Sequence, residues 1–81
     1  MKIAGFDLSQ HAKDTFQDRS NILVEWIERA ILKPDWTENV SSTEFHYIRR
    51  IPEFGDRFLR VVVNPEKKVI VTFFFDRRLK K

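Results

Sequence analysis

Two apolar runs separated by a short turn constrain the fold of this 81-residue chain more than any other feature. Residues 57–63 and 69–75 are rich in β-branched and aromatic side chains, and the segment 64–68 between them carries a proline at a position that suits a turn. The pattern predicts a β-hairpin. Arg60 lies inside the first run, and because burying an unpaired charge is costly, we expect its side chain to face water, a partner or a ligand.

Most of the chain can be assigned to helices and strands. The expected elements are a short edge strand at 2–7, helices at 9–19 and 21–32, and strands at 44–51, 57–64 and 69–76. Residues 35–43 are polar and are expected to form a loop, with a short strand around 36–40 as the alternative. This order predicts one α+β domain over residues 1–81, with two N-terminal helices packed on a three- to four-stranded antiparallel sheet.

The two expected helices carry start and stop signals. Ser9 is a suitable N-cap for the first helix, and Ser20 or Asn21 for the second. Pro34 ends the second helix because the residue before a proline is driven away from helical angles. The second helix also carries a buried stripe of apolar residues that recur as pairs every four positions: Ile22, Leu23, Trp26, Ile27, Ala30 and Ile31.

Alternation along the middle strand assigns its side chains to two faces of the sheet. Leu59, Val61 and Val63 are expected to face the helices, and Phe58, Arg60 and Val62 the open side. If Asn64 pairs with Lys68, Arg60 stands opposite Thr72, but a one-residue shift would change its neighbours, so the register stays open. The last strand is apolar on both faces, which indicates that its outer side is either covered or a binding surface.

Charge is distributed unevenly along the chain. Residues 1–43 hold five Lys or Arg and seven Asp or Glu, whereas residues 44–81 hold ten and five, so the half that is expected to form the sheet is basic. A basic sheet face is typical of polyphosphate binding, and solvated surface charge is the alternative explanation.

Composition excludes several classes of protein. The chain has no cysteine, which excludes disulfides and thiol chemistry, and its two histidines are too few for a histidine-based zinc site without carboxylates. We therefore expect neither a metal nor a cofactor. No apolar run approaches the ~18 residues of a membrane span, and the N-terminus lacks the apolar stretch of a signal peptide. A cytoplasmic protein without a membrane partner is the expectation.

Several short motifs resemble a known group of bacterial proteins. The segments at 56–63, 69–74 and 76–81, with those at 8–12, 19–22 and 32–34, are similar to those of small toxins of the RelE, ParE and BrnT type, and closest to an uncharacterised family grouped with them. The resemblance implies a metal-independent ribonuclease fold, or, in ParE-like members, a protein that targets gyrase. By position, Arg60 matches the strand arginine near the scissile phosphate, and Arg77 or Arg78 matches the arginine after the last strand.

Metal-free RNA cleavage requires a base for the 2′-hydroxyl, cations at the phosphate and an acid for the leaving oxygen. The expected catalytic residues are His11, Arg60 and Arg77, and the expected nucleic-acid-binding residues are Arg49, Arg50, Arg57, Arg78 and Lys80. Each has an alternative structural explanation. For Arg60 it is an ion pair with Asp76, Glu44 or another sheet carboxylate. For His11 it is an exposed position beside the helix cap, and for His46, also considered as an acid or base, a strand position at the sheet rim.

The sequence therefore predicts a toxin of a toxin–antitoxin-like system that is either a metal-independent endoribonuclease or an RNA-binding relative. Its expected partners are RNA, including RNA on the ribosome, and a cognate antitoxin. The alternative is a non-catalytic domain that binds a protein through its exposed sheet face. Whether the domain is an enzyme, and its oligomeric state, are left open at this stage.

Overall fold

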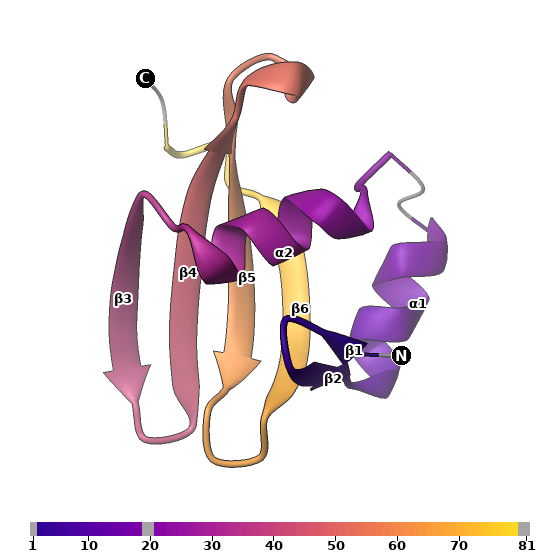
Figure 1. The fold of residues 1–81 in the computed structure, drawn as a ribbon, viewed down its shortest axis with the longest axis vertical. Coiled ribbons are helices and arrows are strands. Elements are labelled where there is room, and N and C mark those ends of the chain that lie inside the picture. The colour runs from indigo at the N-terminus through magenta and orange to yellow at the C-terminus, as the bar shows by residue number, and fades with distance from the viewer. Residues whose placement is uncertain (1, 19–20, 80–81) are drawn as a thin grey trace.

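One six-stranded mixed sheet organises the molecule, with strand order β1-β2-β6-β5-β4-β3. The computed structural model describes residues 2–18 and 21–79 (Figure 1). In chain order the elements are β1 (Lys2–Ile3), β2 (Phe6–Leu8), α1 (Gln10–Asp18), α2 (Val24–Leu32), β3 (Trp36–Ser41), β4 (Glu44–Ile51), the 3₁₀ turn η1 (Pro52–Phe54), β5 (Arg57–Asn64) and β6 (Val69–Phe75). No helix within these described residues is long and apolar enough to cross a membrane.

The expected architecture of two N-terminal helices on a three- to four-stranded antiparallel sheet is wrong. Two strands precede the first helix, and β2 pairs in parallel with β6, which makes the sheet mixed. The reason is a tight turn at Ala4 and Gly5, whose φ angles of 52° and 88° fold β1 back on β2. The backbone groups along the edge of β6 then find partners in β2 and in the residue after it, Ser9, which donates to the Ile70 carbonyl at 3.0 Å.

The segment expected to be mainly a loop, residues 35–43, instead contains the edge strand β3. It pairs antiparallel with β4, so that Glu38 lies opposite His46 and Trp36 opposite Ile48. All six of its residues are exposed, so the strand has no buried side. The sequence therefore lacks the alternation of apolar and polar residues from which a half-buried strand is predicted. The short strand considered as the alternative is therefore the structure that forms.

The central meander of β4, β5 and β6 confirms three predicted strands. The Asn64 side chain accepts hydrogen bonds from the backbone N–H groups of Glu66 and Lys67, at 3.0 and 3.1 Å, and shapes the expected turn. The pair of residues next to the turn is Asn64 with Val69, whereas the register considered from the sequence paired Asn64 with Lys68.

An irregularity between Val62 and Val63 shifts the register between β5 and β6. Together with the pairing of Asn64 to Val69, this irregularity moves the register by two residues, so that Arg60 stands opposite Phe74 and not opposite Thr72 as in the simple register. Such a bulge is set by long-range pairing, and local sequence does not reveal it.

The helix signals were correct for α1 and only partly correct for α2. Ser9 caps α1, since its Oγ accepts the backbone N–H of Ala12 at 3.0 Å. The second helix begins at Val24 after Leu23, three residues later than expected, and no side chain caps it. It ends at Leu32, before Pro34, as predicted. Arg19 and Ser20, the expected end of one helix and cap of the next, lie outside the described residues.

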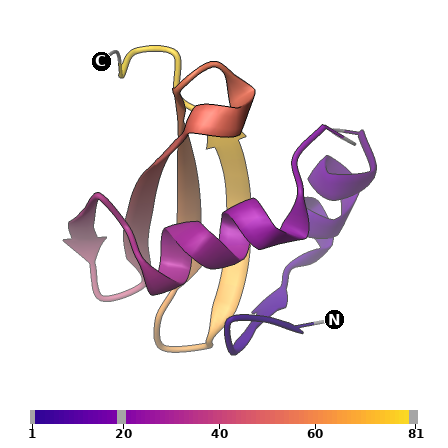
Figure 2. The ribbon, with the colours of Figure 1, turned by 45° about the horizontal axis from the view of Figure 1, so that its top comes forward.

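The core lies between the helices and one face of the sheet. Helix α2 crosses the face formed by β4 and β5, and α1 lies beside β2 and β6 (Figures 1 and 2). Leu59, Val61 and Val63 are buried there with Trp26 and Ile27, as expected.

The opposite face differs from the prediction because it is not open. The side chains of Ile48, Phe58, Arg60 and Val62 on this face are all buried. Within the described chain no helix packs over them, so neighbouring side chains of the sheet and the C-terminal segment provide the cover.

Candidate functional site

Charged side chains gather on the sheet face opposite the helices. They form what we call the Arg60 cluster: Glu38 on β3, Glu44 and His46 on β4, Arg60 on β5, and Asp76 and Arg78 after β6. Antiparallel pairing and side-chain alternation bring the strand members to one face. The cluster therefore draws on four separate parts of the chain.

Arg60 is the centre of this cluster, and its side chain is only 7% exposed. Its Nε donates to Asp76 Oδ2 at 2.9 Å, and its Nη1 donates to Glu38 Oε1 at 2.7 Å. The Asp76 side chain is equally buried, at 3% exposure. A guanidinium tolerates burial when carboxylates and hydrogen bonds replace its water, so the pairing explains why Arg60 can lie inside the sheet face. The ion pair with Asp76, the alternative considered for Arg60, is present.

His46 is held at both ring nitrogens. Its Nδ1 lies 2.8 Å from Arg60 Nη1, and its Nε2 lies 2.7 Å from Glu44 Oε2. Because arginine only donates, Nδ1 must accept, and the proton of the neutral ring lies on Nε2, which donates to Glu44. The ring is 14% exposed and the Glu44 side chain 45% exposed, so the carboxylate is the member of this pair that meets solvent.

Hydrogen bonds from arginines keep two carboxylates of the cluster, Asp76 and Glu38, ionised. Hydrogen bonds from the Arg78 side chain, and then from the Arg78 backbone and Arg60, lower the pKa of Asp76 to about 2. The hydrogen bond from Arg60 likewise lowers the pKa of Glu38. The Arg78 side chain, bonded to Asp76, is 84% exposed and presents a positive charge at the rim.

The register decides which of two adjacent arginines accompanies Arg60. Arg50 lies opposite Phe58, on the face of the cluster, and its Nε is 3.8 Å from Asp56. Arg49 lies on the helix side, where it donates to the Lys33 carbonyl at 3.3 Å after the end of α2. Both of these arginines were predicted to bind nucleic acid, and only Arg50 shares a face with Arg60.

A groove of about 630 Å³ adjoins the cluster at Asp76. It is lined by Gly55, Asp56, Arg57, Phe75, Asp76, Arg77 and Leu79. We call it the Arg57–Arg77 groove. Arg57, Arg77 and Arg78 thus lie near the end of β6, and Lys80 lies outside the described residues.

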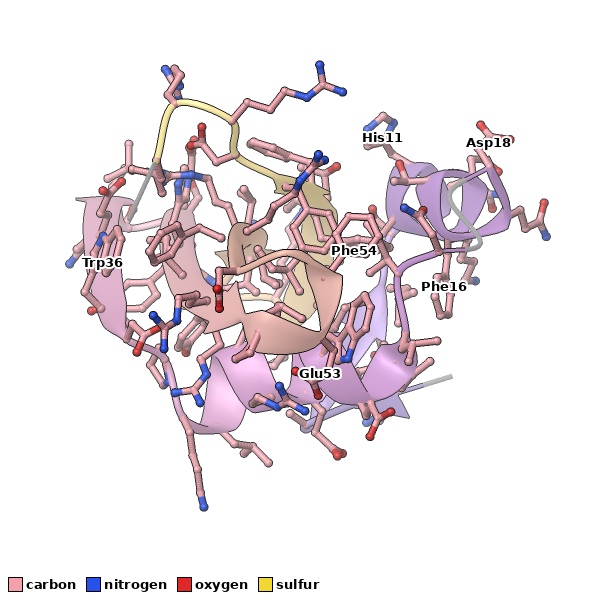
Figure 3. All side chains as sticks on the ribbon, turned by 90° about the horizontal axis from the view of Figure 1, so that it is seen from above. His11, Phe16, Asp18, Trp36, Glu53 and Phe54 are labelled. Carbon is pink, nitrogen blue, oxygen red and sulfur yellow. The ribbon has the colours of Figure 1, made fainter. Side chains whose placement is uncertain are left out.

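His11 does not join Arg60. It is exposed in the first turn of α1, and Figure 3 shows it on the opposite side of the molecule from Trp36. Trp36 donates to Glu38, a member of the cluster, at 3.5 Å. The histidine in contact with Arg60 is His46.

Sequence reasoning did not place Glu38, Glu44 or His46 among the predicted site residues, although it considered Glu44 as an ion-pair partner of Arg60 and weighed His46 as an acid or base. Glu38 was hidden because its segment was expected to be mainly loop. Glu44 and His46 share a strand face by alternation, but only the register shows that this face is the one that carries Arg60. Within the described chain, no group of three or more His, Asp or Glu side chains is placed to hold a metal ion.

Comparison with known proteins yields one match. A family model described as "Domain of unknown function (DUF4258)" matches residues 8–74. The searches of curated proteins and of solved structures found no match.

Proposed function

Because this chain belongs to the family described as Domain of unknown function (DUF4258), its activity has to be argued from its own residues, and we propose that it binds and cleaves RNA without a metal ion. The observation that carries the proposal is the pair of Glu44 and His46, held beside the buried guanidinium of Arg60. In this role the domain would act as the toxin of a toxin–antitoxin pair, as its motifs suggest.

Glu44 is the group that takes the proton in this proposal. His46 Nε2 donates to Oε2 of the carboxylate and fixes its direction, while the carboxylate stays partly exposed to a substrate. Glu44 removes the proton of a ribose 2′-hydroxyl, and the 2′-oxygen attacks the adjacent phosphorus. The bond to the 5′-oxygen breaks, the leaving oxygen takes a proton from water, and Glu44 returns its proton to solvent.

Arginines supply the positive charge that the phosphate requires. Arg78 is exposed at the rim of the cluster. Arg60 bonds through Nε and Nη1, and its Nη2 makes no hydrogen bond to any described residue, which leaves donors for a phosphate oxygen. Arg60 is therefore a positioning residue for His46 as well as a cation near the reacting group.

Cleavage of a mixed-sequence RNA in EDTA tests the proposal. Glu44→Gln should lower the rate about 10²- to 10⁴-fold, the usual contribution of a general base. His46→Asn, which keeps an acceptor for Arg60 but has no ring N–H, should also lower the rate. His11→Asn is the matched control, because it removes the only other histidine, and it should leave the rate unchanged. Wild-type protein that is inert toward RNA, or activity that disappears in EDTA, would contradict the proposal.

A non-catalytic protein-interaction domain is the second candidate, and the edge strand β3 favours it. All six of its residues are exposed, and it is the outermost strand of the sheet. An extended partner segment, such as part of an antitoxin, could add a strand at this edge. Asn39→Pro should then abolish binding to the product of an adjacent antitoxin-like gene. Unchanged binding would rule out this edge.

A further inference from the structure

We propose that the Arg57–Arg77 groove binds one nucleotide of the RNA strand, with its phosphate between the two arginines and its base against Phe75 and Leu79. The inference deepens the proposed function and rests on it for the identity of the ligand. It names a binding site separate from the residues that carry out the cleavage.

Charge balance gives the groove its preference for an anion. Its two carboxylates already face cations, since Asp76 binds Arg60 and Arg78, and Asp56 lies 3.8 Å from Arg50. Its two arginines have no such partners. The side chains of Arg57 and Arg77 make no hydrogen bond or ion pair with any residue in the described part of the chain, so both charges remain available to a ligand.

The shape and lining of the groove fit a planar group beside that anion. Its volume of about 630 Å³ lies within the range of ~300–1,000 Å³ typical of small-molecule sites. Phe75 and Leu79, both half-buried, supply an apolar wall. Phe75 is held rigidly, because it stacks on Phe54 with ring centroids 4.6 Å apart.

The side chain of Arg57 is also held in position, by contact with an aromatic ring. Its guanidinium lies 5.4 Å from the centroid of the Phe54 ring. Phe54 therefore contacts both the aromatic wall and one of the two cations, and Figure 3 labels Phe54 and its neighbour Glu53, which both belong to η1. Glu53 in turn accepts two hydrogen bonds from Arg29, at 2.8 and 3.0 Å, which anchors η1 to α2.

The position of the groove determines its role in cleavage. The C-terminal segment and the η1 turn lie at the same end of the sheet (Figures 1 and 2), whereas Glu44 begins β4 at the other end. Glu44 and Arg50 are six positions apart on β4, which corresponds to ~20 Å at ~3.3 Å per residue. A dinucleotide at Glu44 would not reach the groove, and a longer oligonucleotide would. The groove is thus a positioning site for long substrates.

Direct binding is tested by titrating adenosine 5′-monophosphate, adenosine and inorganic phosphate separately into the wild-type protein, with NMR shifts as the readout. The monophosphate should bind at least tenfold more tightly than either of its parts. Arg77→Gln and Arg57→Gln should each weaken it about tenfold or more, because each removes a charged hydrogen-bond donor. Lys67→Gln, a matched loss of charge in the exposed β5–β6 turn, should not. Equal binding of phosphate and monophosphate, or equal effects of Lys67→Gln and Arg77→Gln, would overturn the proposal.

Kinetics separate the groove from the cleavage site. Arg77→Gln should raise KM for long oligonucleotides several-fold, whereas the control Lys67→Gln should not. If RNA is cleaved but the monophosphate does not bind, the groove proposal fails and the proposed function stands. If the monophosphate binds as described but no RNA is cleaved, the proposed function fails and the groove remains a nucleotide site.

Discussion

At the scale of single residues, Arg60 and Asp76 show how a charged pair can occupy the face of a small sheet. Each side chain is less than a tenth exposed, and each has more than one polar partner. Replacing such a pair with apolar residues can be neutral, whereas removing one partner leaves the other charge buried and uncompensated. The stability of the site therefore depends on keeping both members.

Asp76→Asn should lower the free energy of unfolding by ~2–3 kcal/mol near neutral pH, because the Arg60 guanidinium loses its buried carboxylate partner and keeps only Glu38. Asp76 has a pKa of about 2 in the folded protein against an ordinary 3.8, so its stabilising effect is present above pH 3.8 and is lost as the pH falls through about 2. The gap between wild type and variant should accordingly close in acid. Urea unfolding at pH 7 and at pH 2 measures both effects.

Glu66→Gln is the control for that measurement, because Glu66 is exposed in the β5–β6 turn and its loss should change the stability by no more than ~0.5 kcal/mol. If Asp76→Asn were no less stable than this control at pH 7, the buried pair would contribute nothing.

At the scale of elements, α2 is held to the sheet by a cluster of aromatic rings. The ring centroid of Trp26 lies 5.8 Å from that of Phe54 and 6.2 Å from that of Phe75. Since Phe54 belongs to η1 and Phe75 to β6, one side chain of α2 joins the helix to the turn that precedes the groove and to the strand whose Phe75 lines it. The packing of Trp26 therefore contributes both to the stability of the fold and to the position of Phe75 in the proposed nucleotide site.

Trp26→Ala should cost ~3–5 kcal/mol, the usual effect of truncating a large buried aromatic side chain, and should unfold much of so small a domain. Trp36→Ala is the matched control, because Trp36 is 38% exposed on the edge strand and should lose much less. Thermal melts followed by circular dichroism compare the two. A Trp26 variant that melted within a degree or two of wild type would show that this packing is unimportant.

At the scale of the whole molecule, the basic half of the sequence folds into the central meander and the C-terminal segment. The arginines do not form one continuous patch, because Arg49 donates a hydrogen bond to the Lys33 carbonyl on the helix side and Arg60 is buried. Three exposed arginines lie at one end of the sheet: Arg57 at the start of β5, and Arg77 and Arg78 after β6. RNA binding should therefore depend on this end of the molecule.

The salt dependence of RNA binding measures that contribution. Each neutralised phosphate of a single strand contributes ~0.7 to the slope of log affinity against log salt, so the double variant Arg57→Gln/Arg77→Gln, which removes both cations from the one phosphate in the groove, should flatten the slope by ~0.7. Lys13→Gln/Lys67→Gln removes the same charge from exposed positions on α1 and the β5–β6 turn, and should change the slope little. Equal slopes for the two double variants would mean that RNA binding, if present, does not use the groove.

The sequence by itself determined the features that depend on neighbours along the chain. Ser9 caps α1 through its own hydroxyl, Pro34 follows the end of α2, and Asn64 shapes the turn between β5 and β6. The inward face of β5 follows from alternation alone. Each of these is a local preference, which is why it can be read without knowing the rest of the fold.

Only the tertiary structure decided how distant segments pair. The parallel contact of β2 with β6 satisfies backbone groups of segments far apart in the sequence, and β3 forms an edge strand because its exposed residues pair with β4. The bulge after Val62 places Arg60 opposite Phe74, and Glu38 reaches Arg60 from 22 residues away. A charge inside a strand can be recognised from sequence, but its partner depends on register, which is set by the packing of the whole sheet.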